Sequence, residues 1–171
     1  DVFSIEIVIL YLALLGLSKY LSEDTFSRIL TLLSVALASI LIIVFIQFTV
    51  DDAFITWRYA ANLVSDGVWN WNDSGQRVEA YSNPSYAWLA IIPHYFGFST
   101  ALFFKITGFS LICWLIWRSI SLAKSKLMAS LLLLLILSSP ATWIHTFSGL
   151  ETPLFVVLIF ETLALFIILW N

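Results

Sequence analysis

The sequence predicts an all-α fold, a polytopic bundle of transmembrane helices with an external juxtamembrane amphipathic helix. Three observations carry this prediction: an apolar composition, apolar stretches of membrane-crossing length, and one polar, aromatic segment between them. Of the 171 residues, 61% are hydrophobic and 11% are charged, and the mean hydropathy is +0.97. Roughly 25% of the residues of an ordinary soluble domain are charged. A soluble chain of this size could not cover so much apolar surface, so lipid is the expected surrounding.

Five apolar stretches have the length of a membrane span. About 20 residues cross a hydrocarbon core about 30 Å thick, and backbone groups in lipid must pair within the segment, so each stretch is expected to be a helix. Pro140 lies inside the fourth stretch and predicts a kink toward its outer end. Thr152 and Pro153 are typical of a helix start. The expected spans are residues 2–21, 29–50, 100–122, 127–147 and 153–170.

Residues 85–98 form a shorter apolar stretch. The stretch contains Pro93, His94 and Gly97, and its length suits a re-entrant or juxtamembrane helix better than a span. The orientation follows from the basic residues, which are retained on the cytoplasmic side. If 85–98 does not cross, the segment 51–84 lies outside and both basic loops lie inside. These loops carry Lys19, Arg28, Arg118, Lys124 and Lys126.

The chain is expected to form a single transmembrane domain over residues 1–171. It begins at Asp1 and ends directly after an apolar run, which predicts a portion of a longer protein. No basic cluster indicates a nucleic-acid partner, so none is expected.

The external loop, residues 51–84, is the expected chemical face. Asp51 or Asp52 can cap a helix running to Ser65, which Asp66 and Gly67 would end. Along that helix Phe54, Trp57, Ala61 and Val64 form one apolar stripe, and Asp51, Arg58 and Asn62 share one polar face.

Two interpretations of the loop remain open on the residues alone. Its tryptophans and tyrosines fit an interfacial belt that only anchors the protein. Alternatively, a carboxylate at the membrane surface can take a proton from a hydroxyl, and two adjacent acids can hold a divalent cation. Asp51 and Asp52 alone do not decide between these roles.

The motifs of the loop, taken together, resemble a known family. Asp-Asp-Ala-Phe-Ile at 51–55, Arg58-Tyr59-Ala60 with Asn62-Leu63, and Arg-Val-Glu-Ala-Tyr-Ser-Asn-Pro at 77–84 look like the first extracytoplasmic loop of GT-C membrane glycosyltransferases. The closest likeness is to the mycobacterial terminal arabinofuranosyltransferases and their bacterial relatives. Ser-Gly-Leu-Glu-Thr-Pro at 148–153 also resembles a family motif.

The resemblance implies a GT-C-like N-terminal part in the bacterial inner membrane, with 51–84 external or periplasmic. The implied reaction transfers a sugar from a polyprenyl-phosphate-linked donor to a glycan, lipid or protein hydroxyl. Asp51 is the implied catalytic carboxylate. Asp52 is the implied neighbour that orients it or binds a divalent cation (Mg, Mn or Ca), and no organic cofactor is expected. The candidate substrate-binding residues are Arg58, Tyr59, Asn62, Arg77, Glu79, Tyr81, Asn83, His145 and Glu151.

The sequence departs from the family pattern at several points. Ala80 stands where relatives usually have glycine, and Trp57 where a phenylalanine is common. An additional span, 2–21, precedes the one that enters the loop. GT-C enzymes usually have many more spans, so an N-terminal portion or one half of a split enzyme is expected. The alternative function is a non-catalytic membrane scaffold subunit.

Several polar residues have a structural alternative to a functional role. Arg58 is expected to bind donor phosphate or to pair with Asp51 or Asp52. Asn83 is expected to cap the next helix. Glu151 is expected to bind an acceptor or a cation, or to favour the positive start of the last helix.

Three further polar residues lie in apolar stretches. His94 is expected to be a satisfied interfacial histidine. Lys105 is expected to snorkel, with phosphate binding from an outer-leaflet cavity as the alternative. Glu161, inside the last span, is expected to be functional or to mark an interface with the remainder of the protein.

Overall fold

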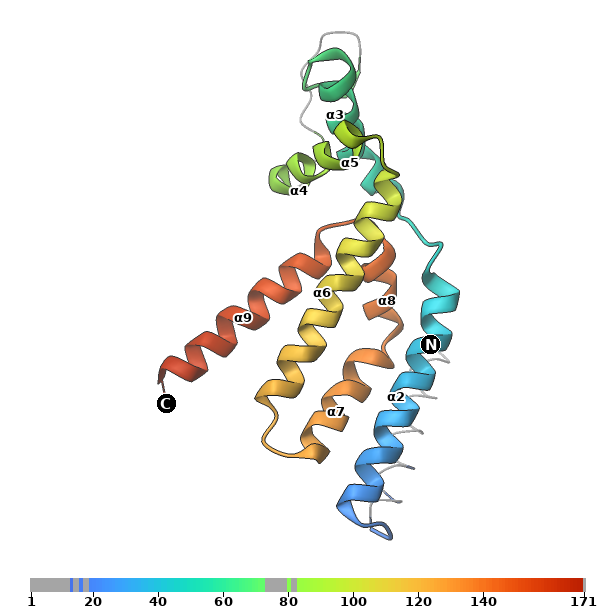
Figure 1. Ribbon diagram of the computed structural model, residues 1–171, viewed down its shortest axis with the longest axis vertical. Coiled ribbons are helices and arrows are strands. Elements are labelled where there is room, and N and C mark those ends of the chain that lie inside the picture. The colour runs from blue at the N-terminus through green and yellow to red at the C-terminus, as the bar shows by residue number, and fades with distance from the viewer. Residues whose placement is uncertain (1–12, 14–15, 17–18, 73–79, 81–82, 171) are drawn as a thin grey trace. The chain divides into compact units, whose positions relative to one another are not determined.

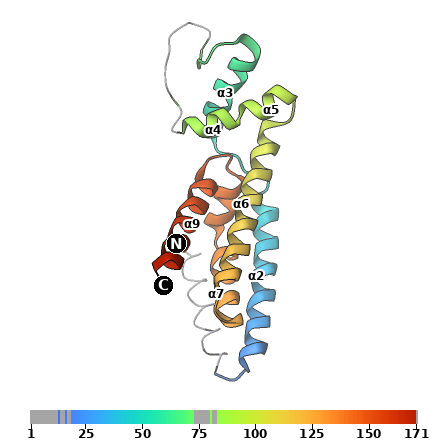
Figure 2. The same cartoon turned by 60° about the vertical axis from the view of Figure 1, so that its left-hand side comes forward.

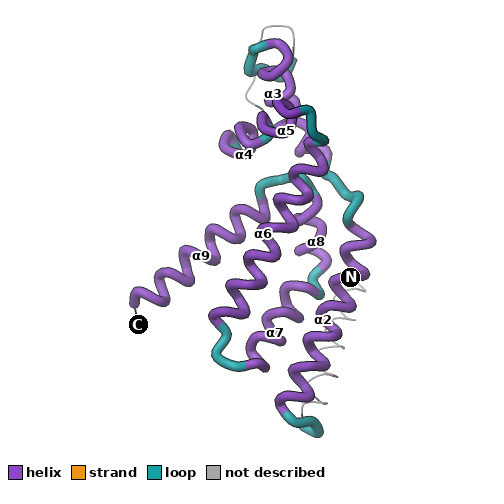
Figure 3. The backbone as a smooth tube through the Cα atoms, in the orientation of Figure 1, coloured by secondary structure: helices purple, strands orange, loops and turns teal. Residues whose placement is uncertain are grey.

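The computed structural model describes residues 13, 16, 19–72, 80 and 83–170 (Figure 1). Within these residues the regular structure is helical and includes no strand (Figure 3), so the predicted all-α class is confirmed there. The first expected span, 2–21, lies almost entirely outside the described residues. The helices in chain order are α2 (Glu23–Phe45), α3 (Asp51–Asp66), α4 (Pro84–Leu89), α5 (Ile91–Phe96), α6 (Thr100–Leu122), α7 (Lys126–Leu137), α8 (Pro140–Phe147) and α9 (Thr152–Trp170).

Three helices, α2, α6 and α9, are long and apolar enough to cross a membrane. In the most apolar stretch of each helix, only 17%, 22% and 17% of the residues are buried inside the protein. Most of the apolar surface of these helices therefore faces outward. Such surface is stable in lipid rather than in water. These helices indicate a membrane protein, as the composition predicted.

The fourth expected span is broken rather than kinked. α7 ends at Leu137 and α8 begins at Pro140. Only the two helices together are long and apolar enough to cross a membrane, as a broken span or a re-entrant loop. Pro140 has no N–H to bond the preceding turn, so it begins a new helix instead of continuing the old one. Ser139 precedes it with the extended backbone of a helix N-cap.

Residues 85–98 hold two short helices instead of one. α4 and α5 contain six residues each, about 9 Å of helix, which is far less than the hydrocarbon core. Ala90 joins them, and Pro93 explains the break because its ring nitrogen cannot bond the carbonyl of Leu89. Gly97 ends α5 with φ 70°. Neither α4 nor α5 is long enough by itself to cross the hydrocarbon core, and the re-entrant or juxtamembrane placement stays a prediction.

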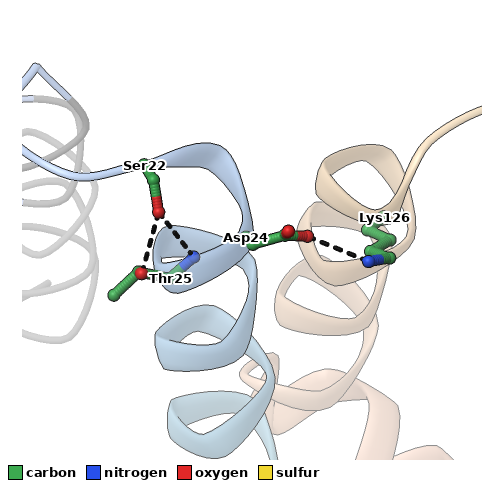
Figure 4. A network of polar contacts seen from close by, with 4 residues as sticks. All are labelled: Ser22, Asp24, Thr25 and Lys126. Carbon is green, nitrogen blue, oxygen red and sulfur yellow. Dashed lines mark hydrogen bonds and ion pairs between the residues drawn. The ribbon is translucent and has the colours of Figure 1, made fainter.

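The contacts divide the chain into two compact units: residues 1–40 with 118–138, and residues 41–117 with 139–171. In the first unit, α2 packs on α7 through buried Phe26, Leu30 and Leu134. Ser22 bonds Thr25 at the start of α2, and Asp24 pairs with Lys126 of α7 (Figure 4).

In the second unit, α3, α4 and α5 gather at the N-terminal end of α6 (Figures 1 and 2). Trp57 of α3 stacks on Phe104 of α6 with 5.7 Å between ring centroids and 5° between planes. Tyr86 of α4 packs on the same Phe104 at 4.6 Å. These rings share one core with Ala53 and Ala60, both fully buried. This core fixes α3 on the N-terminal end of α6.

Candidate functional site

The site begins at the first turn of α3, where Asp51 and Asp52 are both exposed. The prediction that Asp51 or Asp52 caps this helix is wrong. The N-cap residue of α3 is Val50, and no side chain forms a capping hydrogen bond there. The N–H of Val50 donates instead to the carbonyl oxygen of Ser148 at 3.0 Å. A tertiary contact thus sets the start of the helix, and it leaves both carboxylates outward at the positive helix end.

The turn after α8 packs directly on α3. Gly149 has φ 85°, and a Cβ there would lie 2.7 Å from Cζ2 of Trp57 and 3.1 Å from Cβ of Ala53. Only a residue without a side chain fits this approach. The 148–153 motif and the start of the 51–84 motif therefore lie together, although about 100 residues separate them in the sequence.

Two of the predicted residues lie on this turn or beside it. Glu151 is half-buried, and its carboxylate acts electrostatically on Tyr86. Burial and, secondarily, this carboxylate raise the pKa of Tyr86 far above its usual range. His145 is exposed in the last turn of α8, and its carbonyl accepts a hydrogen bond from Oγ of Ser148 at 2.9 Å. An acid and an imidazole thus lie on the elements that border the start of α3.

An aromatic platform, defined as Tyr59, Trp69, Trp71 and Trp88, lies along the other part of α3. Trp69 and Trp88 stack with centroids 5.4 Å apart and 18° between planes. The ring of Tyr59 lies 5.6 Å from Trp69 and 6.1 Å from Trp71. The guanidinium carbon of Arg58 lies 5.0 Å from the Trp71 ring centroid, a cation–π contact. Trp88 is 61% exposed, so the platform is open to a ligand or to lipid.

Two predicted substrate-binding residues, Tyr59 of the platform and Asn62 beside it, form hydrogen bonds to the backbone of the loop. Tyr59 is 1% exposed, and its hydroxyl accepts a hydrogen bond from the N–H of Ala80 at 3.1 Å. Asn62 donates from Nδ2 to the carbonyl oxygen of Asn70 at 2.9 Å. Both side chains are occupied in positioning the loop. In this structure they support the site rather than line it.

The structure also bears on the alternatives for Arg58 and Asn83. Among the described residues, the partner of the Arg58 guanidinium is Trp71 rather than Asp51 or Asp52. Asp51 lies seven residues away, a rise of about 10.5 Å, and helix ion pairs form at three or four residues. Asn83 caps α4, since its Oδ1 accepts from the N–H of Tyr86 at 3.3 Å. The capping interpretation of Asn83 is therefore confirmed.

The apolar stripe predicted for α3 is only partly correct. Trp57 is buried, but Phe54 and Val64 are exposed, at 54% and 38%. The buried face runs instead through Ala53, Trp57 and Ala60, because small residues let α3 approach its neighbours closely. Arg77, Glu79 and Tyr81 lie outside the described residues.

A divalent cation has no evident ligand set in the described part of the chain. No group of three or more His, Cys, Asp or Glu side chains that could hold a metal ion occurs among the described residues. Asp51 and Asp52 are consecutive residues on a helix, so their side chains leave the axis about 100° apart. No step of the function proposed below is routed through a cation.

A groove in the same unit holds Lys105 and is here called the Lys105 groove. Its volume is about 410 Å³, and Nζ of Lys105 donates to the carbonyl oxygen of Ile46 at 2.7 Å. The sequence offers a cavity at Lys105 as the alternative to snorkelling, but it does not show which other residues line the groove. The groove is lined by Ile42, Ile46, Leu102, Lys105, Ile106, Phe109 and Phe147.

Three short connections link the Lys105 groove to the carboxylates. Ile46 precedes Asp51 by five residues. Phe147 directly precedes Ser148, which accepts the Val50 hydrogen bond. Lys105 directly follows Phe104, which stacks on Trp57. The Lys105 groove and the two exposed acids therefore belong to one unit and are joined by short stretches of chain.

Comparison of the chain with protein-family models, with curated proteins and with solved structures found no match. The resemblance to GT-C enzymes thus rests on the sequence motifs.

Proposed function

We propose that the chain carries the donor-side part of a membrane glycosyltransferase of GT-C type. It would take a sugar from a polyprenyl-phosphate-linked donor and transfer it to a glycan, lipid or protein hydroxyl at the external face. The observation that supports the proposal is the presence, within one unit, of exposed Asp51 and Asp52 and of an apolar groove that holds Lys105. An apolar groove with one ammonium group suits a lipid chain that ends in a phosphate.

In the proposed reaction, the carboxylate of Asp51 takes the proton of the acceptor hydroxyl. The acceptor oxygen then forms a bond to the anomeric carbon of the sugar as the bond from that carbon to the phosphate oxygen breaks. The lipid phosphate leaves with the electron pair, and the ammonium group of Lys105 stabilises its charge. A phosphate is a good leaving group, so positioning, proton removal and charge stabilisation are the main tasks of the protein.

The aromatic platform supports the same proposal. Rings of Trp69, Trp71 and Trp88 offer flat apolar faces, on which the C–H faces of a sugar can pack. Arg58 lies over Trp71 with a guanidinium group that can donate to hydroxyls or phosphate. Glu151 and His145, on elements bordering the start of α3, are proposed to bind the acceptor. Interfacial anchoring by these tryptophans is compatible with this role.

The test is Asp51→Asn in the full-length protein, with transfer from a polyprenyl-phosphate-linked sugar measured in isolated membranes. Loss of a general base lowers rates about 10²- to 10⁴-fold. The matched control is Asp66→Asn, which changes an exposed aspartate at the opposite end of α3 and should leave transfer unchanged. Full transfer by Asp51→Asn at normal expression would contradict the catalytic assignment. If deletion of the chain still abolished transfer, the scaffold alternative would then hold.

A further inference from the structure

A second groove lies within the unit formed by residues 1–40 and 118–138, and the proposed function does not use it. α2, the end of α6 and α7 form it, and its volume is about 590 Å³. We call it the Arg28 groove. It is lined by Asp24, Ser27, Arg28, Thr31, Leu32, Ile120, Lys126, Ala129, Ser130 and Leu133.

The mouth of the Arg28 groove is charged, with two cations and one anion. Asp24 and Lys126 pair at 2.9 Å, and their side chains are 64% and 78% exposed (Figure 4). Water screens such an exposed pair, so it opens at little cost. Arg28 is also exposed. The mouth therefore carries a net positive charge and can present two cations to an anion.

Three hydroxyl groups lie further along the groove. Thr31 and Ser130 donate to backbone carbonyls of their own helices, each at 2.9 Å. Ser27 is only 5% exposed, and its Oγ has no hydrogen-bond partner within the described part of the chain. A buried hydroxyl without a partner is unfavourable by about 1–3 kcal/mol. An acceptor oxygen from a bound ligand would remove this cost.

The remaining wall of the groove is apolar. Leu32, Ile120 and Leu133 lie on helices whose apolar surface indicates lipid contact, and Leu32 is 71% exposed. A hydrocarbon chain can lie along this wall, whereas a water-soluble anion gains nothing from it. The groove thus changes from cationic to hydroxyl-bearing to apolar, which is the polarity order of a phospholipid.

We propose that the Arg28 groove binds an anionic phospholipid. The phosphate lies between Arg28 and Lys126, the oxygens near the glycerol accept from the Ser27 hydroxyl, and one acyl chain lies along Leu32 and Leu133. The bound lipid belongs to the leaflet at the basic end of the spans, which the charge distribution predicts to be cytoplasmic. Basic pockets between transmembrane helices commonly bind such headgroups. The proposal stands independently of the glycosyltransferase proposal.

The test is a native mass spectrometry titration of the purified full-length protein in detergent. Phosphatidylglycerol and phosphatidylcholine with identical acyl chains are compared, and phosphatidylglycerol should bind more tightly. Arg28→Gln with Lys126→Gln should weaken phosphatidylglycerol binding about 25-fold, about five-fold for each cation near the membrane surface. The matched control is Lys124→Gln, which removes an exposed lysine outside the groove and should change binding less than two-fold.

A second variant tests the placement of the acyl chain. Ala129→Phe fills the groove without removing a charge and should also weaken binding. Unchanged binding in the double variant, or equal affinity for both lipids, would overturn the proposal. So would full competition by glycerol 3-phosphate, because a free phosphate would then be the true ligand. Binding seen only after removal of residues 1–18 would show that the chain's own N-terminal segment occupies the groove.

Discussion

The Lys105 groove and the Arg28 groove each combine an apolar wall with basic side chains, but they hold these side chains differently. Of the described residues that line the first groove, Lys105 alone is charged, and its Nζ is fixed on the Ile46 carbonyl oxygen. Lys126, in the second groove, is 78% exposed and pairs only with an exposed aspartate among the described residues. A partly buried charge held on a backbone carbonyl suits a reaction, whereas an exposed charge at a hydroxyl-bearing mouth suits the retention of a headgroup.

The packing around the two lysines differs in the same direction. Phe104, next to Lys105, is 1% exposed and lies between Trp57 and Tyr86. Lys126 is exposed in the first turn of α7, between exposed Ser125 and half-buried Leu127. A core that fixes a cation within a fraction of an ångström gives transition-state stabilisation that a flexible cation cannot give. The difference in packing is what the two proposals require, with chemistry at Lys105 and lipid retention at Lys126.

The largest expected difference between the two grooves appears when each lysine is neutralised in turn. Lys105→Met should lower sugar transfer about 10²- to 10³-fold, the usual effect of removing one group that stabilises developing charge. Lys126→Met should leave transfer unchanged, because its groove has no part in the reaction. Lys105→Arg should restore much of the rate. Initial rates of transfer in membranes, at equal protein levels, measure all three variants. Equal losses of transfer rate from Lys105→Met and Lys126→Met would contradict the different roles proposed for the two grooves.

The next effect concerns the turn that joins the 148–153 motif to α3. Gly149→Ala places a methyl group 2.7 Å from the Trp57 indole at φ 85°, which should lower stability by about 2–3 kcal/mol through strain and overpacking. The matched control is Gly97→Ala, at φ 70° with open space around it, which should cost about 1 kcal/mol. Thermal unfolding in detergent compares the two. A smaller loss for Gly149→Ala than for Gly97→Ala would contradict the close approach.

Local signals in the sequence predicted much of this region. The end of α3 at Asp66, the left-handed Gly67 and the Asn83 cap follow from the conformational preferences of those residues. The short helices within 85–98 follow from the length of this stretch and from Pro93. Each of these features depends on neighbours within a few residues, so a single sequence contains the necessary information.

The parts that sequence could not predict all depend on distant contacts. Val50 became the N-cap because Ser148 accepts its hydrogen bond. Tyr59 and Asn62 are candidate substrate-binding residues in the sequence, but in the structure the Tyr59 hydroxyl accepts from the N–H of Ala80 and Asn62 donates to the carbonyl oxygen of Asn70. The Lys105 groove combines residues from α2, α6 and α8, and no periodicity shows which of three helices come together.

A smaller effect on sugar transfer is expected from removing helix caps, of which one in each unit is compared. Asn83 caps α4 beside the proposed site, and Ser125 caps α7, where its Oγ accepts from the N–H of Met128 at 3.1 Å. Asn83→Ala and Ser125→Ala should each lower stability by about 1 kcal/mol. Only Asn83→Ala should also reduce transfer, because α4 carries Trp88 of the platform. Thermal unfolding and sugar transfer are measured for both variants. An equal loss of transfer in the two variants would contradict a role of the Asn83 cap in the proposed site.

The smallest expected effect is a pH dependence confined to the external region. Burial lowers the pKa of His94 below its ordinary 6.5, and a backbone hydrogen bond with Trp57 opposes this shift. His94 Nε2 also lies 3.2 Å from Oγ1 of Thr100, so the neutral ring is a satisfied interfacial histidine. Between the lowered pKa and 6.5, His94 binds more protons in the locally opened state than in the folded state. The free energy of local opening is therefore at its full value above pH 6.5 and falls as the pH drops through that window. Hydrogen exchange should therefore speed up in α5 and at the start of α6 at pH 5.5 relative to pH 7.5, after correction for intrinsic rates, while α7 stays unchanged. His94→Gln should abolish the difference, and an equal change in α7 would show that the effect is not local to His94.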